Sequence, residues 1–370
     1  MSEVRRPFAE SSLAFSKGMD SRMRPLRIPT FLAFLIMTSA ALEASFASAG
    51  IADMMESGYI HQLRSTRSTL GRISKQACLH EQCDGSVSQT CESYYQRMER
   101  DGVLDVRVAF GYMDVSMGEP YEYNGRDLGQ SPAIDRPAAL AMRELLTTSC
   151  AWSRTEACGF TARADDPSVL EKYVQRRSGH QVLVRLRVTH ASASISHDDN
   201  LGSLRQFQEQ LTAQSNESFF GGLHQADALL YLGHARNGGG PDFTPVVLAP
   251  AAPGKLRKPN YGGHYQARRP GLTRMLQELR ASQQRPAMIT LLACSSDRHF
   301  TASVRRASPD TALITTGDLI YYDEILNAAL GNIEALVRGS CGDEFRRNLQ
   351  LTPFAQREVL LRNFPAQVGP

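Results

Sequence analysis

Residues 226–241 read ADALLYLGHARNGGGP, and residues 287–296 read AMITLLACSS. Each stretch is a short apolar run that ends in a polar or glycine-rich turn. Runs of this length, bounded by turn residues, are typical of strands buried in a parallel sheet. The two stretches therefore predict two such strands, and a third apolar run, TALITT at 311–316, predicts another.

Segments with helical periodicity lie between the apolar runs. The sequence predicts a strand at 181–189, a helix that follows the polar cap at 197–200, and further helices at 272–279 and 325–337. Strands that alternate with helices indicate an α/β fold, in which helices flank a mostly parallel sheet. Earlier in the chain we expect helices at 50–100 and 137–148, a strand at 103–116, and a loop at 118–137.

Two reactive side chains follow the ends of two predicted strands. His234 comes two residues after the run that ends at Leu232, and Cys294 comes two residues after Leu292. In parallel sheets functional groups gather at the carboxyl ends of the strands, and neighbouring strands lie about 4.8 Å apart. A thiol attacks carbonyls as the thiolate and needs a nearby base such as histidine. The sequence therefore predicts a His234/Cys294 catalytic dyad.

This pattern resembles the caspase-like cysteine peptidase superfamily, which includes caspases, legumains, gingipains, clostripain, separase and the CHAT domains. Its signature is an apolar strand ending in His-Gly, followed by a second apolar strand ending in Ala-Cys or Gly-Cys. The matching stretches here are LLYLGHARNGGG and MITLLACSS. The resemblance covers roughly residues 180–340. It implies that Cys294 is the nucleophile, that His234 is the general base or proton donor, and that the substrate is a polypeptide.

The tetrahedral intermediate of such a reaction needs backbone N–H donors for its oxyanion. The N–H groups of Cys294 and of Ala235, which follows His234, are the candidates. The family usually has glycine where this chain has Ala235. Ala235 keeps the N–H, so its use depends on whether its backbone adopts the angles that the site needs.

Three further residues are candidates for the substrate pocket. Asp242 and Asp318 could select a basic side chain by charge pairing, and His264 lies in a predicted loop. His299, five residues after Cys294, is expected on the next helix, either near the dyad or at the surface. The sequence contains no G-x-S-x-G, P-loop or H-E-x-x-H motif, and we expect neither a cofactor nor a catalytic metal.

The N-terminal residues 1–49 resemble a secretory signal peptide. Three arginines, Arg22, Arg24 and Arg27, precede an apolar run at 31–42 and a small-residue site at Ala47 and Ala49. Translation could start at Met19 or Met23 instead of Met1. The alternatives are a buried helix or an uncleaved anchor, but the run of about 12 residues is short for a membrane span. We therefore expect an exported protein, periplasmic or secreted, without a stable membrane anchor.

The seven cysteines fit an oxidising compartment. Cys150 and Cys158 flank a short turn and are predicted to pair, whereas the partners of Cys78, Cys83, Cys91 and Cys341 stay open. Cys294 is then the cysteine left over. A zinc site that uses His80 and the cysteines at 78, 83 and 91 is the alternative, although their spacing fits no C-x₂-C pattern.

The whole chain of 370 residues has a net charge of +3 and is 42% hydrophobic, values that argue against a nucleic-acid binder and against wholesale disorder. After the signal peptide we expect a cysteine-containing accessory region at 50–175, the catalytic domain at 176–345 and a tail at 346–370. Residues 50–175 could instead add elements to the main sheet. Two functions follow: an exported cysteine endopeptidase, or a catalytically inactive domain of the same fold that binds a partner.

Overall fold

A computed structural model describes residues 30–80, 89–115, 119–123, 125–151, 154–176, 178–246, 249–252, 255–257 and 261–365. Within these ranges the side chains of residues 30–49, 76–80 and 261–264, among a few others, are not described. Residues 47–370 form one compact unit, and the preceding residues, up to 46, form another.

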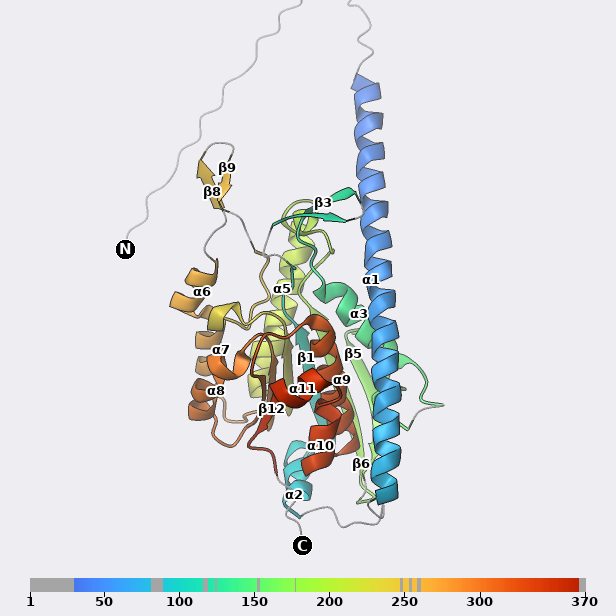
Figure 1. The fold of residues 1–370 in the computed structure, drawn as a ribbon, viewed down its shortest axis with the longest axis vertical. Coiled ribbons are helices and arrows are strands. Elements are labelled where there is room, and N and C mark those ends of the chain that lie inside the picture. The colour runs from blue at the N-terminus through green and yellow to red at the C-terminus, as the bar shows by residue number, and fades with distance from the viewer. Residues whose placement is uncertain are drawn as a thin grey trace, which may run out of the picture. The chain divides into compact units, whose positions relative to one another are not determined.

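The predicted α/β fold with a mostly parallel sheet is confirmed (Figure 1). The sheet has eight strands in the order β12-β11-β10-β7-β1-β6-β5-β4. They are β1 (Val103–Phe110), β4 (Thr161–Ala162), β5 (Val169–Gln175), β6 (Gln181–His190), β7 (Ala228–Leu232), β10 (Met288–Leu292), β11 (Ala312–Thr316) and β12 (Val359–Arg362). The five strands from β11 to β6 run parallel, and the strands outside them are antiparallel to their neighbours.

Helices cover both faces of the sheet, which explains why β7, β10 and β11 are buried along their whole length. On one face, which we call the α9 face, the core includes residues of six helices. They are α1 (Thr30–His80), α2 (Gln89–Met98), α3 (Asp135–Thr147), α9 (Tyr322–Arg338), α10 (Gly342–Leu349) and α11 (Pro353–Glu358). On the other face, the α5 face, the core includes residues of α5 (Arg205–Phe220), α7 (Pro270–Ala281) and α8 (Ser296–Ala307).

The remaining elements are short. Two of them, α4 (His197–Leu201) and α6 (Tyr261–Arg268), are helices, and single 3₁₀ turns lie at Gly221–His224 and Arg236–Gly238. The cap expected at 197–200 is not found there, because these residues lie inside α4; the cap is Ser196, whose side chain accepts a hydrogen bond from the Asp199 N–H. Two hairpins lie outside the main sheet: β2 (Pro120–Tyr123) with β3 (Arg126–Gln130), and β8 (Ala249–Ala252) with β9 (Lys255–Arg257).

Three segments differ from the sequence-based expectation. The stretch 118–137, expected as a loop, contains β2 and β3 and the start of α3. The segment 346–370, expected as a tail, contributes α11 and the edge strand β12. The expected boundary between 175 and 176 falls between β5 and β6, which pair along their length, and β1 from the first half lies at the centre of the sheet. Residues of 50–175 therefore add elements to the main sheet, because β1 supplies the pairing surface between β6 and β7.

Two disulfides form among the cysteines whose side chains the structure describes. The predicted pair Cys150–Cys158 is confirmed, and Cys91 bonds to Cys341 across a sequence separation of 250 residues. Cys294 is free. Cys83 and the side chain of Cys78 lie outside the described residues, so the zinc alternative is not tested, and no group of potential metal ligands occurs among the residues that are described. The two disulfides are compatible with an exported protein.

The predicted signal peptide falls largely outside the described residues. Arg22, Arg24 and Arg27, together with Met19 and Met23, are not described, whereas the apolar run at 31–42 belongs to α1, which continues through Ala49. Within the described part of the chain, no helix is long and apolar enough to cross a membrane. The signal peptide stays a prediction.

Removing the Cys91–Cys341 disulfide should destabilise the fold more than removing Cys150–Cys158. The first closes a ring of 250 residues and the second a ring of 8, and a longer ring restricts the unfolded chain more. We expect losses in the free energy of unfolding of about 5 and about 2–3 kcal/mol, respectively. Denaturant unfolding of the Cys91→Ala/Cys341→Ala and Cys150→Ala/Cys158→Ala variants, followed by circular dichroism, measures both. Equal losses would contradict this expectation.

Asp227 carries a partly buried carboxyl group at the start of β7. Its Oδ2 accepts a hydrogen bond of 2.8 Å from the Asp105 N–H, and its carbonyl accepts the N–H of Ala287. Burial, with smaller contributions from the charges of Asp105 and Asp101, raises the pKa of Asp227 from 3.8 to about 7. The folded chain therefore holds a proton between about pH 4 and 7 that the unfolded chain releases, so this group lowers stability as the pH rises through that window.

Asp227→Asn should stabilise the protein at pH 8 but not at pH 4. The neutral amide keeps an oxygen that accepts the Asp105 N–H and removes the buried charge. We expect a gain on the order of 1–2 kcal/mol at pH 8, which vanishes at pH 4 because the carboxyl group is then protonated in the folded protein. Unfolding curves of both proteins at the two pH values test this. A difference that does not depend on pH would exclude the titration of Asp227 as its cause.

Candidate active site

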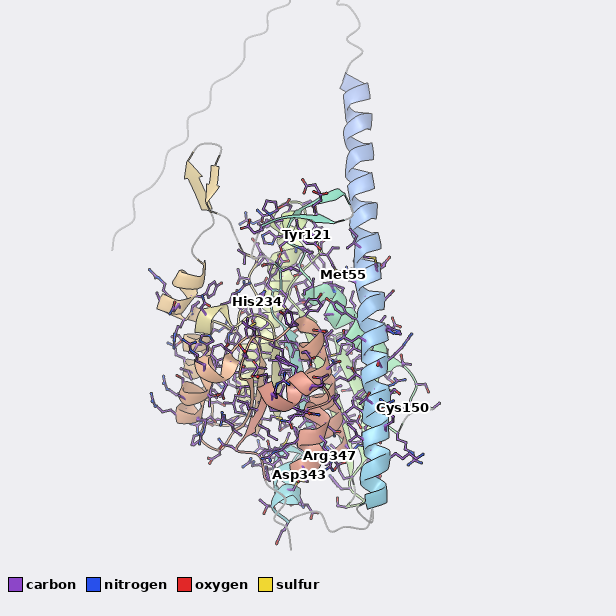
Figure 2. The ribbon with its side chains drawn as sticks, viewed as in Figure 1. Met55, Tyr121, Cys150, His234, Asp343 and Arg347 are labelled. Carbon is purple, nitrogen blue, oxygen red and sulfur yellow. A yellow bond between two sulfur atoms is a disulfide. The ribbon has the colours of Figure 1, made fainter. Side chains whose placement is uncertain are left out.

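The strands that precede His234 and Cys294 are direct neighbours. β7 and β10 pair in parallel with Leu232 opposite Leu292, and the Gly233 N–H donates to the Leu292 carbonyl at 3.2 Å. His234 and Cys294 each follow these paired residues by two positions. They therefore leave the same edge of the sheet from equivalent places on adjacent strands, as the sequence predicted; His234 is labelled in Figure 2.

The His234 ring is oriented by a backbone carbonyl. Its Nε2 lies 2.9 Å from the carbonyl oxygen of Asp114, in the segment that follows β1. A carbonyl can only accept a hydrogen bond, so Nε2 carries the proton and Nδ1 of the neutral ring keeps its lone pair. Burial, followed by the positive charge of Arg236, lowers the pKa of His234 from 6.5. The ring is therefore neutral at pH 7 and has one nitrogen available to accept a proton.

Cys294 lies in a tight turn between β10 and α8. Ser295 adopts left-handed backbone angles (φ 50°, ψ 33°), and its N–H donates to the Asp318 carbonyl at 2.8 Å. Ser296 anchors the turn, because its hydroxyl donates to the Leu291 carbonyl and accepts the Thr316 N–H. The thiol is half-buried and donates to the Ile320 carbonyl at 3.7 Å. The turn places the thiol just before the N-terminus of α8, whose N–H groups favour negative charge.

The two predicted oxyanion donors are the backbone N–H groups of Ala235 and Cys294. Within the described part of the chain, the N–H groups of Ala235 and Cys294 donate no hydrogen bond. Ala235 has φ −71° and ψ −15°, angles that every residue adopts readily. Alanine in place of glycine therefore costs no backbone strain here. Both candidate oxyanion donors remain available.

The loop after Ala235 has a strained backbone. Arg236, Asn237 and Gly238 have φ of 48°, 51° and 85°, all in the left-handed region. Asparagine and glycine tolerate this region, whereas arginine rarely adopts it. A Cβ on Gly238 would lie 2.9 Å from Nδ1 of His299, so only glycine fits against that ring. Such outliers persist only where the surrounding structure holds them.

A buried ion pair holds this loop. The Arg236 guanidinium donates to Asp242 Oδ2 at 3.1 Å and to the Tyr112 carbonyl at 3.2 Å. The Tyr265 hydroxyl donates to the same carboxylate at 3.0 Å. Tyr231, on β7, donates its hydroxyl hydrogen to the His234 carbonyl and accepts the Asp242 N–H. These contacts determine where the backbone of His234 and Ala235 lies.

The structure separates the three pocket candidates. Asp242 is buried and neutralised by Arg236, so its carboxylate is committed to the loop. Asp318 is exposed beside the Cys294 turn, and its carboxylate accepts a hydrogen bond from the Leu319 N–H. His264 belongs to α6 rather than to a loop, and its side chain lies outside the described ones. His299 lies on α8, as expected; it is half-buried and packs against Gly238.

Cys294 and His234 do not hydrogen-bond to each other in this structure. Each side chain contacts a backbone carbonyl instead, those of Ile320 and Asp114. Catalytic hydrogen bonds are often long or absent before the substrate binds. The geometry therefore provides a neutral base, a free thiol and two N–H donors at one sheet edge, and proton transfer requires the two side chains to approach.

Sequence reasoning missed Asp114, Tyr231 and Arg236. Asp114 follows β1 at the same edge of the sheet as His234, so the central place of β1 in the strand order would have suggested it. Tyr231 lies within an apolar run and Arg236 in a glycine-rich loop, where neither residue type indicates a buried network. Comparison with protein-family models, curated proteins and solved structures finds no match to this chain.

Breaking the Arg236–Asp242 pair should destabilise the protein strongly. Arg236→Gln leaves the Asp242 carboxylate buried without its partner, and we expect a loss of about 3–5 kcal/mol in the free energy of unfolding. The double variant Arg236→Gln/Asp242→Asn removes both charges and should recover part of that loss. Unfolding of both variants and of Asp242→Asn alone completes a double-mutant cycle. A coupling energy near zero would show that the pair does not hold the loop.

Proposed function

We propose that this chain is an exported caspase-like cysteine endopeptidase that acts through Cys294 and His234. The observation that carries the proposal is the pairing of β7 with β10, which brings a free thiol and a neutral imidazole to one edge of the sheet. His234 would take the thiol proton at Nδ1, and the sulfur would attack the peptide carbonyl to form an acyl-enzyme. The same imidazole would then protonate the leaving amine.

The backbone around the dyad supports this chemistry. The free N–H groups of Ala235 and Cys294 could receive the oxyanion of the tetrahedral intermediate, and the N-terminus of α8 adds favourable partial charge. The Asp114 carbonyl keeps the proton on Nε2 of His234. Nδ1 of His234 therefore keeps its lone pair and can accept the thiol proton.

The segment after β11 offers a surface for a polypeptide. Leu319 and Tyr321 are 63% and 72% exposed, and they flank Ile320, whose carbonyl contacts the thiol. Asp318 precedes them and is also exposed. Exposed apolar residues beside a reactive thiol favour a substrate with apolar side chains near the scissile bond, and Asp318 could pair with a basic one.

The rival function is a catalytically inactive domain that binds a partner through the same surface. The absence of a hydrogen bond between Cys294 and His234 favours it, since the thiol contacts the Ile320 carbonyl instead. The presence of Ala235 where the family has glycine does not favour the inactive domain, because the backbone angles of Ala235 need no glycine. Reactivity of the thiol therefore separates the two functions.

A peptide-library cleavage assay tests the peptidase. We expect the protein without residues 1–49 to cleave a subset of peptides. Cys294→Ala should lower kcat/KM at least about 1,000-fold, and His234→Ala about 100-fold or more. His180→Ala is the matched control, because this histidine is exposed in the turn between β5 and β6, and it should keep full activity.

If no peptide is cleaved, the rate at which iodoacetamide alkylates Cys294 near pH 6 distinguishes the two functions. A fast modification of Cys294 that His234→Ala slows, and His180→Ala does not, supports an activated thiol. A Cys294 that reacts no faster than a free thiol, and equally in all three proteins, would overturn the peptidase and leave the binding domain.

A further inference from the structure

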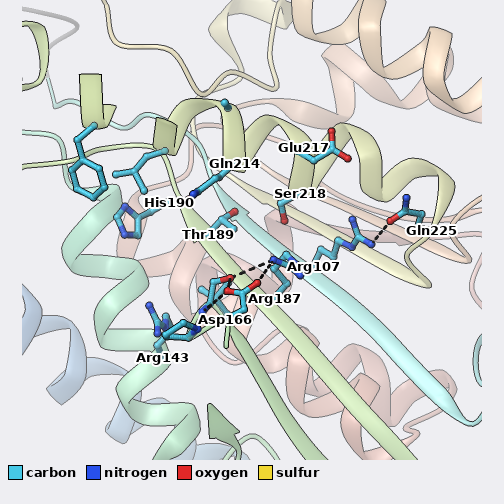
Figure 3. Close-up of a pocket in the computed structure, with 16 residues that line it drawn as sticks. Arg107, Arg143, Asp166, Arg187, Thr189, His190, Gln214, Glu217, Ser218 and Gln225 are labelled. Carbon is cyan, nitrogen blue, oxygen red and sulfur yellow. Dashed lines mark hydrogen bonds and ion pairs between the residues drawn. The ribbon is translucent and has the colours of Figure 1, made fainter. Parts of the chain in front are cut away.

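A groove lies on the α5 face of the sheet, between α5 and the strands β1 and β6 (Figure 3). Its volume is about 910 Å³, within the range of small-molecule sites. Cys294 packs against the core of the opposite face, and His234 does not line the groove. The groove is therefore separate from the candidate active site.

Three arginines line the groove, and two of them have acidic partners. Arg187 pairs with Asp166 at 2.8 Å, and Arg107 pairs with Asp105 at 3.2 Å. Arg143, from α3, donates to the Pro167 carbonyl, and its Nε has no partner among the described residues. Among those residues Arg143 also has no ion pair. Arg143 is thus the groove arginine without an ion pair; the charge of Asp166 still acts on it, and Glu217 also lines the groove.

Two buried hydroxyl groups of the groove lack partners. Thr189, on β6, is 9% exposed and Ser218, on α5, is 3% exposed, and neither oxygen has a hydrogen-bond partner within the described part of the chain. Figure 3 shows them between the helix and the strands. A buried hydroxyl left unpaired loses its hydrogen bonds to water without replacement, so a polar occupant that pairs with these groups would be favoured.

His190 adds an acceptor at the end of β6. Its Nδ1 lies 3.0 Å from the Ser192 carbonyl, so Nδ1 carries the proton and Nε2 keeps a lone pair. Burial lowers the pKa of His190 to about 4, and the ring is neutral at pH 7. A neutral ring in this position can accept a hydrogen bond from a ligand hydroxyl.

We propose that this groove binds a small organic anion, in which a carboxylate or phosphate group pairs with Arg143 and a hydroxylated body meets Thr189, Ser218 and His190. Arginine suits both anions because its planar guanidinium matches their paired oxygens. The apolar side chains of Phe207 and Leu211, which line the groove from α5, suit the carbon skeleton. The proposal does not depend on the peptidase activity.

Calorimetric titration at constant ionic strength tests the groove with four probes: citrate, glucose 6-phosphate, inorganic phosphate and neutral glucose. We expect saturable binding of citrate or of glucose 6-phosphate, tighter than that of inorganic phosphate, and none of glucose. Binding of citrate alone assigns a carboxylate ligand, and binding of glucose 6-phosphate alone a phosphate ester.

Three variants locate the binding. Arg143→Gln should weaken it at least about 10-fold, which equals the loss of one charge-assisted hydrogen bond. Valine has the shape of threonine without the hydroxyl, so Thr189→Val should weaken binding about 3- to 10-fold. This variant tests the groove if Arg143→Gln does not fold. Arg205→Gln is the control, since Arg205 is exposed at the start of α5, pairs with Glu209 and does not line the groove.

The proposal is overturned if neither organic anion binds saturably below about 10 mM, or if inorganic phosphate binds as tightly as both. It is also overturned if Arg205→Gln weakens binding as much as Arg143→Gln, or if Thr189→Val has no effect. Calorimetry measures the binding of citrate and glucose 6-phosphate to the wild-type protein without a cleavage assay, so failure of this proposal is distinguishable from failure of the peptidase proposal.

Discussion

The in-register parallel pairing of β7 with β10 is the constraint on which the candidate site depends. Leu232 faces Leu292, so the residues two positions later, His234 and Cys294, leave the sheet at the same level. A shift of one residue would reverse which face each strand presents and separate the two side chains. The register is held because β7 and β10 are buried throughout, with Leu230 and Leu232 in one core and Leu229 and Tyr231 in the other.

Sheet pairing alone does not determine the conformation of the turns that follow the strands. Polar contacts hold these turns in place. On the His234 side, the Arg236–Asp242 pair and the Tyr231 hydroxyl hold a loop with left-handed residues. On the Cys294 side, Ser296 and the Asp318 carbonyl hold the left-handed Ser295. Each turn therefore directs a candidate residue away from the strand path, and the hydrogen bonds offset the cost in backbone strain.

The apolar runs predicted β7, β10 and β11 and placed His234 and Cys294 beyond two of them, because a strand buried on both faces is apolar along its whole length. TALITT and AMITLLA became β11 and β10, and the short turn between Cys150 and Cys158 indicated their disulfide. Long-range partners were beyond this reasoning. The bond between Cys91 and Cys341, the pairing of β12 with β11 and the Asp114 carbonyl on His234 join segments far apart in the chain. Their local sequences carry no signal of the partner.

The replacement of glycine by Ala235 shows why a sequence departure must be judged by its backbone angles. A glycine is required where φ is positive or where a Cβ would collide, and neither condition holds at Ala235, with φ −71°. The requirement falls instead on Gly238, which has φ 85° and the His299 ring close by, and on Gly233, where a Cβ would lie 2.8 Å from the Tyr231 hydroxyl. In this chain Gly233 and Gly238, before and after His234 and Ala235, are the positions where the loop has no room for a Cβ. Ala235 therefore keeps its N–H available without needing the conformational freedom that glycine would provide.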